Sequence, residues 1–160
     1  MTRQRGAVLL AGLTLTLLLG MMSAAALREA LLETRQAGDL LTQVRAFEQA
    51  EAAVLAGVDT LRLAPPALCL DCLPPAWPGH SGAGSAGWTR TAEGFHRVQN
   101  LGPTTLATRL PKGTPATLFR ITAVSRHEAT PQVIEALYAV PMQAPQTAVR
   151  VLWRQRFKEG

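Results

Sequence analysis

The stretch that decides the fold is Ala7–Leu27, AVLLAGLTLTLLLGMMSAAAL, in which no residue carries a charged side chain. A helix of this length spans ~31 Å, which matches the ~30 Å hydrocarbon core of a bilayer. The hydroxyl groups of Thr14, Thr16 and Ser23 are tolerated in lipid, because each can bond to a backbone carbonyl one turn back. The sequence therefore predicts a membrane-spanning helix over residues 7–27.

The charges around this stretch predict its orientation. Arg3 and Arg5 lie on its short N-terminal side, whereas Arg28 is offset locally by Glu29 and Glu33. The excess of arginine before the span places the N-terminus in the cytoplasm by the positive-inside rule. We therefore expect a single-pass inner-membrane protein whose remaining residues lie in the periplasm.

Residues 28–63 predict an amphipathic continuation of the same helix. The chain has no proline between Leu27 and Leu63, and Pro65 ends the stretch. Apolar residues recur at spacings of three and four, which places them on one face of a helix. We expect this helix packing face to contain Leu40, Val44, Phe47, Val54 and Val58. The second half of the helix therefore needs a partner surface on one side.

The apolar stretch leaves three interpretations open. It could be an uncut anchor followed by a stalk helix, or a secretory signal cut after Ala26 in the small-residue run Ala24–Ala26. It could also follow a short basic leader, residues 1–6, which is cut after Gly6 and leaves Ala7 as the first mature residue. A secretory signal has no reason to continue in phase into an amphipathic helix, so the sequence favours a retained span.

Residues 64–160 are expected to form a globular head. Prolines and glycines predict a loop without regular structure over residues 64–88. Apolar and polar residues then alternate in short runs, which predicts an antiparallel meander packed on the long helix, an α+β fold. The expected strands are Thr117–Val124, Val133–Val140 as a central strand, Thr147–Phe157, and Gly94–Gln99 as a fourth. The sheet is expected to cover the helix face that carries Leu40, Val44, Phe47 and Val54.

Cys69 and Cys72 are expected to form a disulfide, because the predicted topology places them in an oxidising compartment. A thioredoxin-like site needs a βαβ unit, whereas here Pro74 and Pro75 follow directly. A zinc site needs two further ligands, and His80 and His96 do not have the usual spacing.

Other motifs predict no chemistry. Residues 82–87, GAGSAG, match the dinucleotide fingerprint but lack the strand before and the helix after it, so we interpret them as a loop tip. His127 and Glu128 read as solvated turn residues. We expect no catalytic residue, no cofactor and no metal, and hence no enzyme.

The net charge of +5 does not predict a nucleic-acid ligand. The 16 basic residues are scattered, and aromatic residues make up 5% of the chain. A phosphate-binding stripe would need clustered basic residues. The basic residues near the C-terminus are interpreted as solubilising charges on an edge strand: Arg150, Arg154, Arg156 and Lys158. Contact of these residues with an acidic neighbour or with DNA is the less favoured alternative.

Four segments carry a resemblance to a known family. Arg5–Leu10, RGAVLL, resembles the leader junction of type IV prepilins, particularly of PilX-type minor pilins. Leu32–Asp39, LETRQAGD, is similar to that family's Leu-Glu-x-Arg-x-Ala-Gly-Asn stretch, and Ala46–Val54, AFEQAEAAV, to its Ala-Phe-x-Ala-Ala-Glu-Ala-Ala-Leu stretch. Phe119–Ala123 resembles the strand that often opens the C-terminal region. The resemblance covers about the first 58 residues well.

The resemblance implies a minor pilin with a long helix packed on a small sheet. A prepilin peptidase would cut after Gly6 and methylate the new N-terminus at Ala7. The implied partners are other minor pilins, the major pilin, the inner-membrane assembly platform and a tip adhesin. Ala11 stands where most pilins carry a glutamate, which PilX-type proteins commonly lack. We therefore expect a subunit that primes or caps the fibre, exposed at the cell surface after assembly. K-type pseudopilins of type II secretion also lack this glutamate, but their heads are normally much larger.

Overall fold

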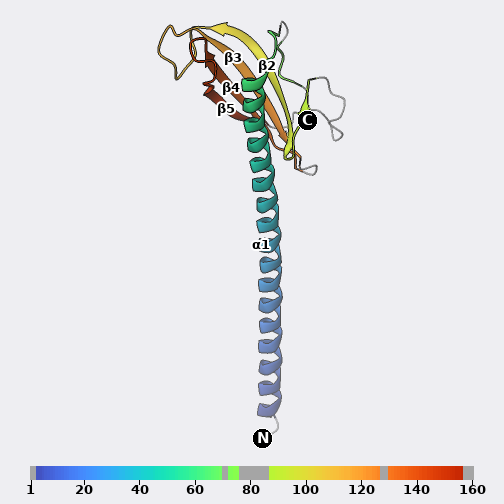
Figure 1. The fold of residues 1–160 in the computed structure, drawn as a ribbon. Helices are drawn as coiled ribbons and strands as arrows, with labels where there is room; N and C mark the ends of the chain where they lie inside the picture. The colour runs from blue at the N-terminus through green and yellow to red at the C-terminus, as the bar shows by residue number, and fades with distance from the viewer. Residues whose placement is uncertain (1–2, 70–71, 76–86, 127–129, 157–160) are drawn as a thin grey trace. The chain divides into compact units, whose positions relative to one another are not determined.

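The computed structural model describes residues 3–69, 72–75, 87–126 and 130–156 of the chain. Their elements, in chain order, are the helix α1 (Arg3–Leu63) and the strands β1 (Thr89–Arg90), β2 (Gly94–Thr104), β3 (Ala116–Ser125), β4 (Val133–Pro141) and β5 (Val149–Arg156). The strands form one antiparallel sheet (Figure 1). The expectation of an α+β fold with a long N-terminal helix is confirmed.

The helix α1 runs through both halves of the predicted segment and ends where the prolines begin. The amide of Ala64 donates to the carbonyl of Thr60 at 2.9 Å, and Pro65 and Pro66 follow. Proline cannot continue the helical hydrogen-bond ladder, which accounts for the end at Leu63. The chain divides into two compact units, Met1–Leu41 and Thr42–Gly160, with the boundary inside α1.

The sheet is a meander in the order β1-β2-β3-β4-β5, so each strand pairs with its neighbours in the sequence. The predicted run Gly94–Gln99 forms part of β2, which extends further, to Thr104. The strand β4 lies between β3 and β5, as its nearly continuous apolar sequence indicated. The two-residue strand β1 was not predicted.

A bulge in β2 connects the sheet to the segment that follows the helix. The pairing of β2 with β3 shifts between Asn100 and Gly102. Gly102 has a φ of 100°, which favours glycine, and its amide donates to the side-chain oxygen of Asn100 at 3.0 Å. Leu68 forms an isolated bridge with Asn100. The start of the predicted loop 64–88 is thus attached to the sheet.

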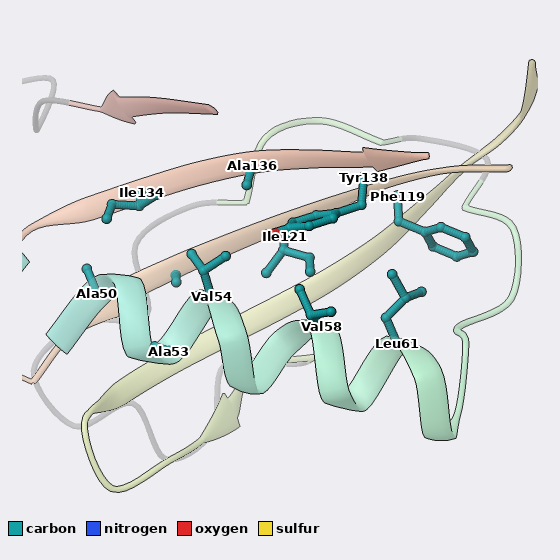
Figure 2. Close-up of a cluster of buried hydrophobic side chains, with 11 residues drawn as sticks. Ala50, Ala53, Val54, Val58, Leu61, Phe119, Ile121, Ile134, Ala136 and Tyr138 are labelled. Atoms are coloured by element: carbon teal, nitrogen blue, oxygen red, sulfur yellow. The ribbon is translucent and has the colours of Figure 1, made fainter. Parts of the chain in front are cut away.

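The core lies between the last turns of α1 and one face of the sheet. Val54, Val58 and Leu61 on the helix are buried, and Figure 2 shows their side chains directed at the strands. The helix-facing side chains of β3 and β4 complete the cluster: Phe119, Ile121, Ala123, Ile134, Ala136 and Tyr138. They alternate along each strand with residues of the opposite face, which is the pattern of a sheet with two different environments.

Candidate functional site

The first part of α1 is an apolar segment with exposed side chains. Large side chains such as Leu9, Leu18 and Met22 are exposed around the helix. The helix is long and apolar enough to cross a membrane by length and composition, and none of its most apolar window is buried. The predicted cleavage residues Gly6 and Ala7 lie within the first turns of α1, and Ala7 is exposed.

The hydroxyl groups within this segment donate hydrogen bonds to backbone carbonyls of the same helix. Thr14 donates to the carbonyl of Ala11 and Thr16 to that of Leu13, both at 2.9 Å. Ser23 donates to a carbonyl one turn back at 2.9 Å. The predicted internal hydrogen bonds are confirmed, and they lower the cost of these polar groups in an apolar environment.

Three of the five residues of the predicted packing face contact the head. Val54 and Val58 are buried, and Phe47 is half-buried against the core. The ring of Phe47 meets the ring of Trp153 on β5 in an edge-on arrangement, with centroids 5.8 Å apart. Such aromatic pairs add about 0.5–1.5 kcal/mol beyond the area that they bury.

The expectation that the sheet covers Val44 is wrong, and Leu40, which is 62% exposed, belongs to the other compact unit. The side chain of Val44 remains 45% exposed, because burial along α1 begins only at Ala46. From there the helix presents small residues to the sheet, and three of them are fully buried: Ala46, Ala50 and Ala53. Periodicity predicted the direction of the face but gave no sign of where along the helix the sheet starts.

Gly57 lies where the backbone of α1 closely approaches side chains of the sheet. A Cβ atom at this position would lie 2.6 Å from Cγ2 of Ile121 and 3.4 Å from Cδ2 of His96. A methyl group would therefore overlap the side chain of Ile121 on β3. The absence of a side chain at Gly57 allows the core to close around His96.

His96 is a buried histidine on the helix-facing side of β2. Its Nε2 lies 3.1 Å from the hydroxyl oxygen of Thr60, and that hydroxyl also donates to the carbonyl of Ala56 at 3.0 Å. This arrangement favours the tautomer whose proton is on Nε2, with Nδ1 buried and without a hydrogen-bond partner. Burial lowers the pKa of His96 from its ordinary value of 6.5. His96 is thus a neutral core residue, and neither a metal ligand nor a catalytic base is indicated.

The buried His96 predicts a loss of stability in mild acid. Burial lowers the pKa of His96 in the folded state, and the unfolded chain keeps the ordinary value of 6.5. The contribution of neutral His96 to the free energy of unfolding is therefore complete above pH 6.5. This contribution to the free energy of unfolding falls as the pH drops below 6.5 towards the folded pKa. Denaturant titrations of the full chain in detergent, between pH 7.5 and pH 5 (roughly the range in which histidine titrates), measure this loss. His96→Gln should flatten the profile in that window.

The control for this measurement is internal. His80 and His127 lie outside the described residues but are present in both proteins, so the difference between the two profiles reports His96. Identical profiles for the wild type and His96→Gln would show that His96 does not control the acid response.

The segment that contains Cys69 and Cys72, here called the cysteine loop, lies against the face of the sheet opposite α1. The structure joins Cys69 and Cys72 in a disulfide. The amide of Cys69 donates to the carbonyl of Asn100 at 3.1 Å, and the side chain of Asn100 donates to the carbonyl of Pro66 at 3.0 Å. These bonds hold the loop against β2 in place of a regular strand.

Two sheet side chains hold the other end of the loop. Arg120 donates to the carbonyl of Cys72 at 2.9 Å, and Gln99 donates to the carbonyl of Leu73 at 3.1 Å. A loop without regular structure has backbone groups that need partners, and the polar face of the sheet supplies them.

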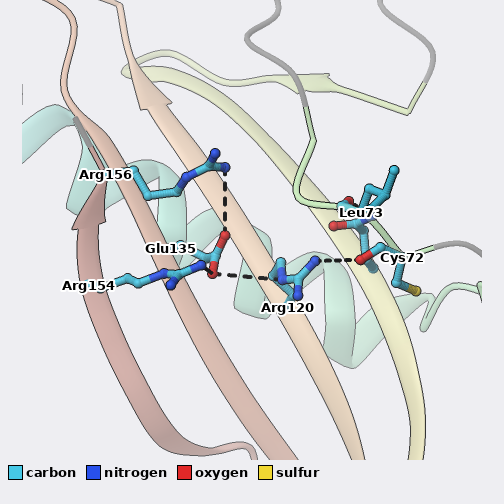
Figure 3. A network of polar contacts seen from close by, with 7 residues as sticks. Cys72, Leu73, Arg120, Glu135, Arg154 and Arg156 are labelled. Atoms are coloured by element: carbon cyan, nitrogen blue, oxygen red, sulfur yellow. Dashed lines mark hydrogen bonds and ion pairs between the residues drawn. The ribbon is translucent and has the colours of Figure 1, made fainter. Parts of the chain in front are cut away.

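Arg120 also belongs to an ion-pair cluster around Glu135 on β4 (Figure 3). Glu135 is only 2% exposed, and its Oε1 lies 2.6 Å from Nη2 of Arg154. Nε of Arg120 and Nη1 of Arg156 each lie 3.8 Å from a carboxylate oxygen. Three guanidinium groups from β3 and β5 thus surround one buried carboxylate, which links three strands and, through Arg120, the cysteine loop.

This cluster was not predicted from the sequence, where Val133–Val140 is nearly all apolar and the arginines of β5 are interpreted as solubilising edge charges. The latter interpretation is wrong for Arg154 and Arg156, which pair with Glu135. The signal was a lone acidic residue within an apolar strand, next to one strand that carries Arg120 and another that carries arginines at alternate positions. Opposite charges on facing strand positions are expected to pair.

Removal of the buried charge should destabilise the head. We expect Glu135→Gln to lower the free energy of unfolding by about 3 kcal/mol, because three arginines lose a buried partner. Glu93→Gln is the matched control, because Glu93 is exposed and lies in a turn between β1 and β2. Chemical denaturation of the full chain measures both, and equal stability of the two variants would contradict a structural role for Glu135.

The described residues contain no group of three or more histidine, cysteine or acidic residues that could hold a metal ion. Several residues singled out in the sequence lie outside the described residues, namely His80, residues 82–86, His127 and Glu128. No family model matches the chain, and neither the curated proteins nor the solved structures compared with it give a match. The arrangement of one long N-terminal helix packed on an antiparallel sheet is nevertheless pilin-like.

Proposed function

We propose that this protein is a minor pilin of the PilX type, a structural subunit that primes or caps a type IV pilus, with no catalytic activity. One observation carries the proposal. The apolar segment and the part of α1 that packs on the sheet belong to one uninterrupted helix, Arg3–Leu63. A subunit that leaves the membrane to join a fibre needs its apolar segment to stay covalently attached to its head.

The sequence resemblance supports the same proposal. The segments similar to PilX-type pilins occur in the expected order, at the leader junction and at Leu32–Asp39 and Ala46–Val54. Within Ala46–Val54, the buried residues are Ala46, Ala50, Ala53 and Val54. Their packing on the sheet gives this segment a structural reason for its small and apolar residues.

The proposed partners follow from this role. In the membrane, the helix would pack with other minor pilins and with the major pilin at the assembly platform. A prepilin peptidase would process the leader, and a tip adhesin is the proposed partner of the head. After assembly the head would lie on the cell surface.

The leader predicts a defined mature N-terminus. N-terminal sequencing of the protein from its native membrane should start at Ala7, carrying an added methyl group. Gly6→Val should leave Met1–Gly6 attached, because the bulkier side chain at the cut site blocks the peptidase. Gly12→Val, a glycine replaced one turn and a half further along the same helix, should be processed normally.

The same measurement separates the alternatives. A mature chain that starts at Leu27 would identify a secreted binding protein cut after Ala26. An uncut Met1 in the wild type would identify a plain anchor. Either result would overturn the proposed pilin processing.

Ala11 predicts where the subunit lies in the fibre. A pilin glutamate at this position would pair with the N-terminal ammonium of a neighbouring subunit, and an unpaired carboxylate in lipid is costly. Without it, the subunit should occupy fibre ends, and immunogold labelling of sheared pili should place it there. Ala11→Glu should move part of the label into the shaft.

The position of the subunit in the fibre is tested separately from the cleavage of its leader. A wild-type label spread along the shaft at the density of the major pilin would contradict a priming or capping role while leaving the pilin assignment intact.

A further inference from the structure

The strand β5 is an open edge of the sheet. It pairs with β4 on one side, and no described strand pairs with its other side. The pairing with β4 shifts between Leu137 and Tyr138, which leaves Val151 outside the regular ladder. The carbonyl of Val151 accepts a hydrogen bond from the hydroxyl of Thr108 at 3.3 Å. The regular open edge is therefore Leu152–Arg156.

The helix-facing side of this edge carries an apolar patch around Trp153, and Gln155 and Arg150 share that side. Trp153 is partly exposed beside the ring of Phe47, and Leu55 on α1 is 64% exposed. A pocket of about 290 Å³ lies next to them, large enough for an aliphatic side chain. Its lining comprises Glu51, Val54, Leu55, Tyr138, Arg150 and Trp153.

The opposite side of the edge carries two arginines beside the exposed Leu152. Arg154 and Arg156 alternate with Trp153 and Gln155 along β5, so they lie on the face away from α1. Both pair with Glu135, but a third arginine shares the same carboxylate, which leaves an excess of positive charge. The side chain of Arg154 is also 54% exposed and can reach a second acidic partner.

These observations favour one kind of binding partner for the open edge of β5. We infer that Leu152–Arg156 accepts an extended segment of another polypeptide, in which apolar side chains alternate with acidic ones. The added strand would bond to the free backbone groups of β5, as in other cases of strand addition. Its apolar side chains would contact Trp153 and enter the pocket beside Leu55. Its carboxylates would face Arg154 and Arg156, where cross-strand charge pairs stabilise a sheet.

A second copy of this chain does not fit as the occupant. An alternating segment needs acidic residues two positions apart, and no two of the head's acidic residues have that spacing: Asp71, Glu93, Glu128, Glu135 and Glu159. The inference also makes no use of the apolar segment of α1, so it can hold or fail separately from the proposed pilin role.

Two capped synthetic peptides test the inference on the full chain in detergent micelles. The first, TVEVEVT, alternates valine with glutamate, and the second, TVKVKVT, replaces the glutamates with lysine. At saturating concentration the acidic peptide should slow amide hydrogen exchange of Leu152–Arg156 by about threefold or more, because strand addition protects an exposed edge. The basic peptide should leave these rates within measurement error, since like charges on facing strands repel.

Variants then locate the binding. Trp153→Ala should abolish the protection, whereas Leu63→Ala, which removes an exposed leucine at the end of α1, should retain it. Exchange rates in β3 show whether each variant is folded. If Trp153→Ala fails to fold, the comparison of the two peptides on the wild type decides.

Three results would overturn the inference. The acidic peptide could leave the rates of Leu152–Arg156 unchanged, or it could protect another segment in place of β5. Equal protection by both peptides would remove the charge pairing on which the choice of partner rests.

Discussion

The close approach of α1 to β3 is the contact on which the rest of the described head depends. The helix offers residues with little or no side chain at this surface, Ala46, Ala50, Ala53 and Gly57, and its backbone therefore lies close to the sheet. Glycine inside a helix costs about 1 kcal/mol relative to alanine. Each fully buried Val or Leu contributes about 1.5–3 kcal/mol, so the core that closes around Gly57 outweighs this cost.

The face of the sheet opposite α1 packs against a different partner. Its partner is a proline-rich loop that belongs to no helix or strand, so the carbonyls of Cys72 and Leu73 need donors from the sheet, and an apolar face would leave them unsatisfied. Arg120 and Gln99 donate hydrogen bonds to these two carbonyls, and Glu135 forms an ion pair with Arg120. The buried carboxylate is therefore tolerated because it serves a polar network.

Local pattern was sufficient for much of this fold. The spacing of apolar residues and the position of Pro65 predicted a helix that ends at Leu63, and alternation predicted the positions of β3, β4 and β5. These features depend on residues near each other in the sequence. The strand β1 was missed because two residues, Thr89 and Arg90, are too few to show a period.

Contacts between distant segments could not be predicted in the same way. Val44 continues the apolar face, but its burial depends on where the sheet ends, which is a property of the tertiary packing. The same holds for His96 and Glu135, whose partners Thr60 and Arg154 are remote in the sequence. Their burial depends on strand register and on the approach of the helix, which no single segment encodes.

The exposed leucines after the predicted span provide the last constraint. A span that starts at Ala7 fills the hydrocarbon core by about Leu27. Leucines nevertheless remain exposed well beyond it, including Leu31, Leu32, Leu40 and Leu41. Lipid cannot cover these side chains, and the sheet buries α1 only from Ala46 onward. Exposed leucines at these positions are available for contact with another helix. In the proposed assembly the helices of neighbouring subunits supply the missing cover, which a plain anchor with a solvated stalk would leave unexplained.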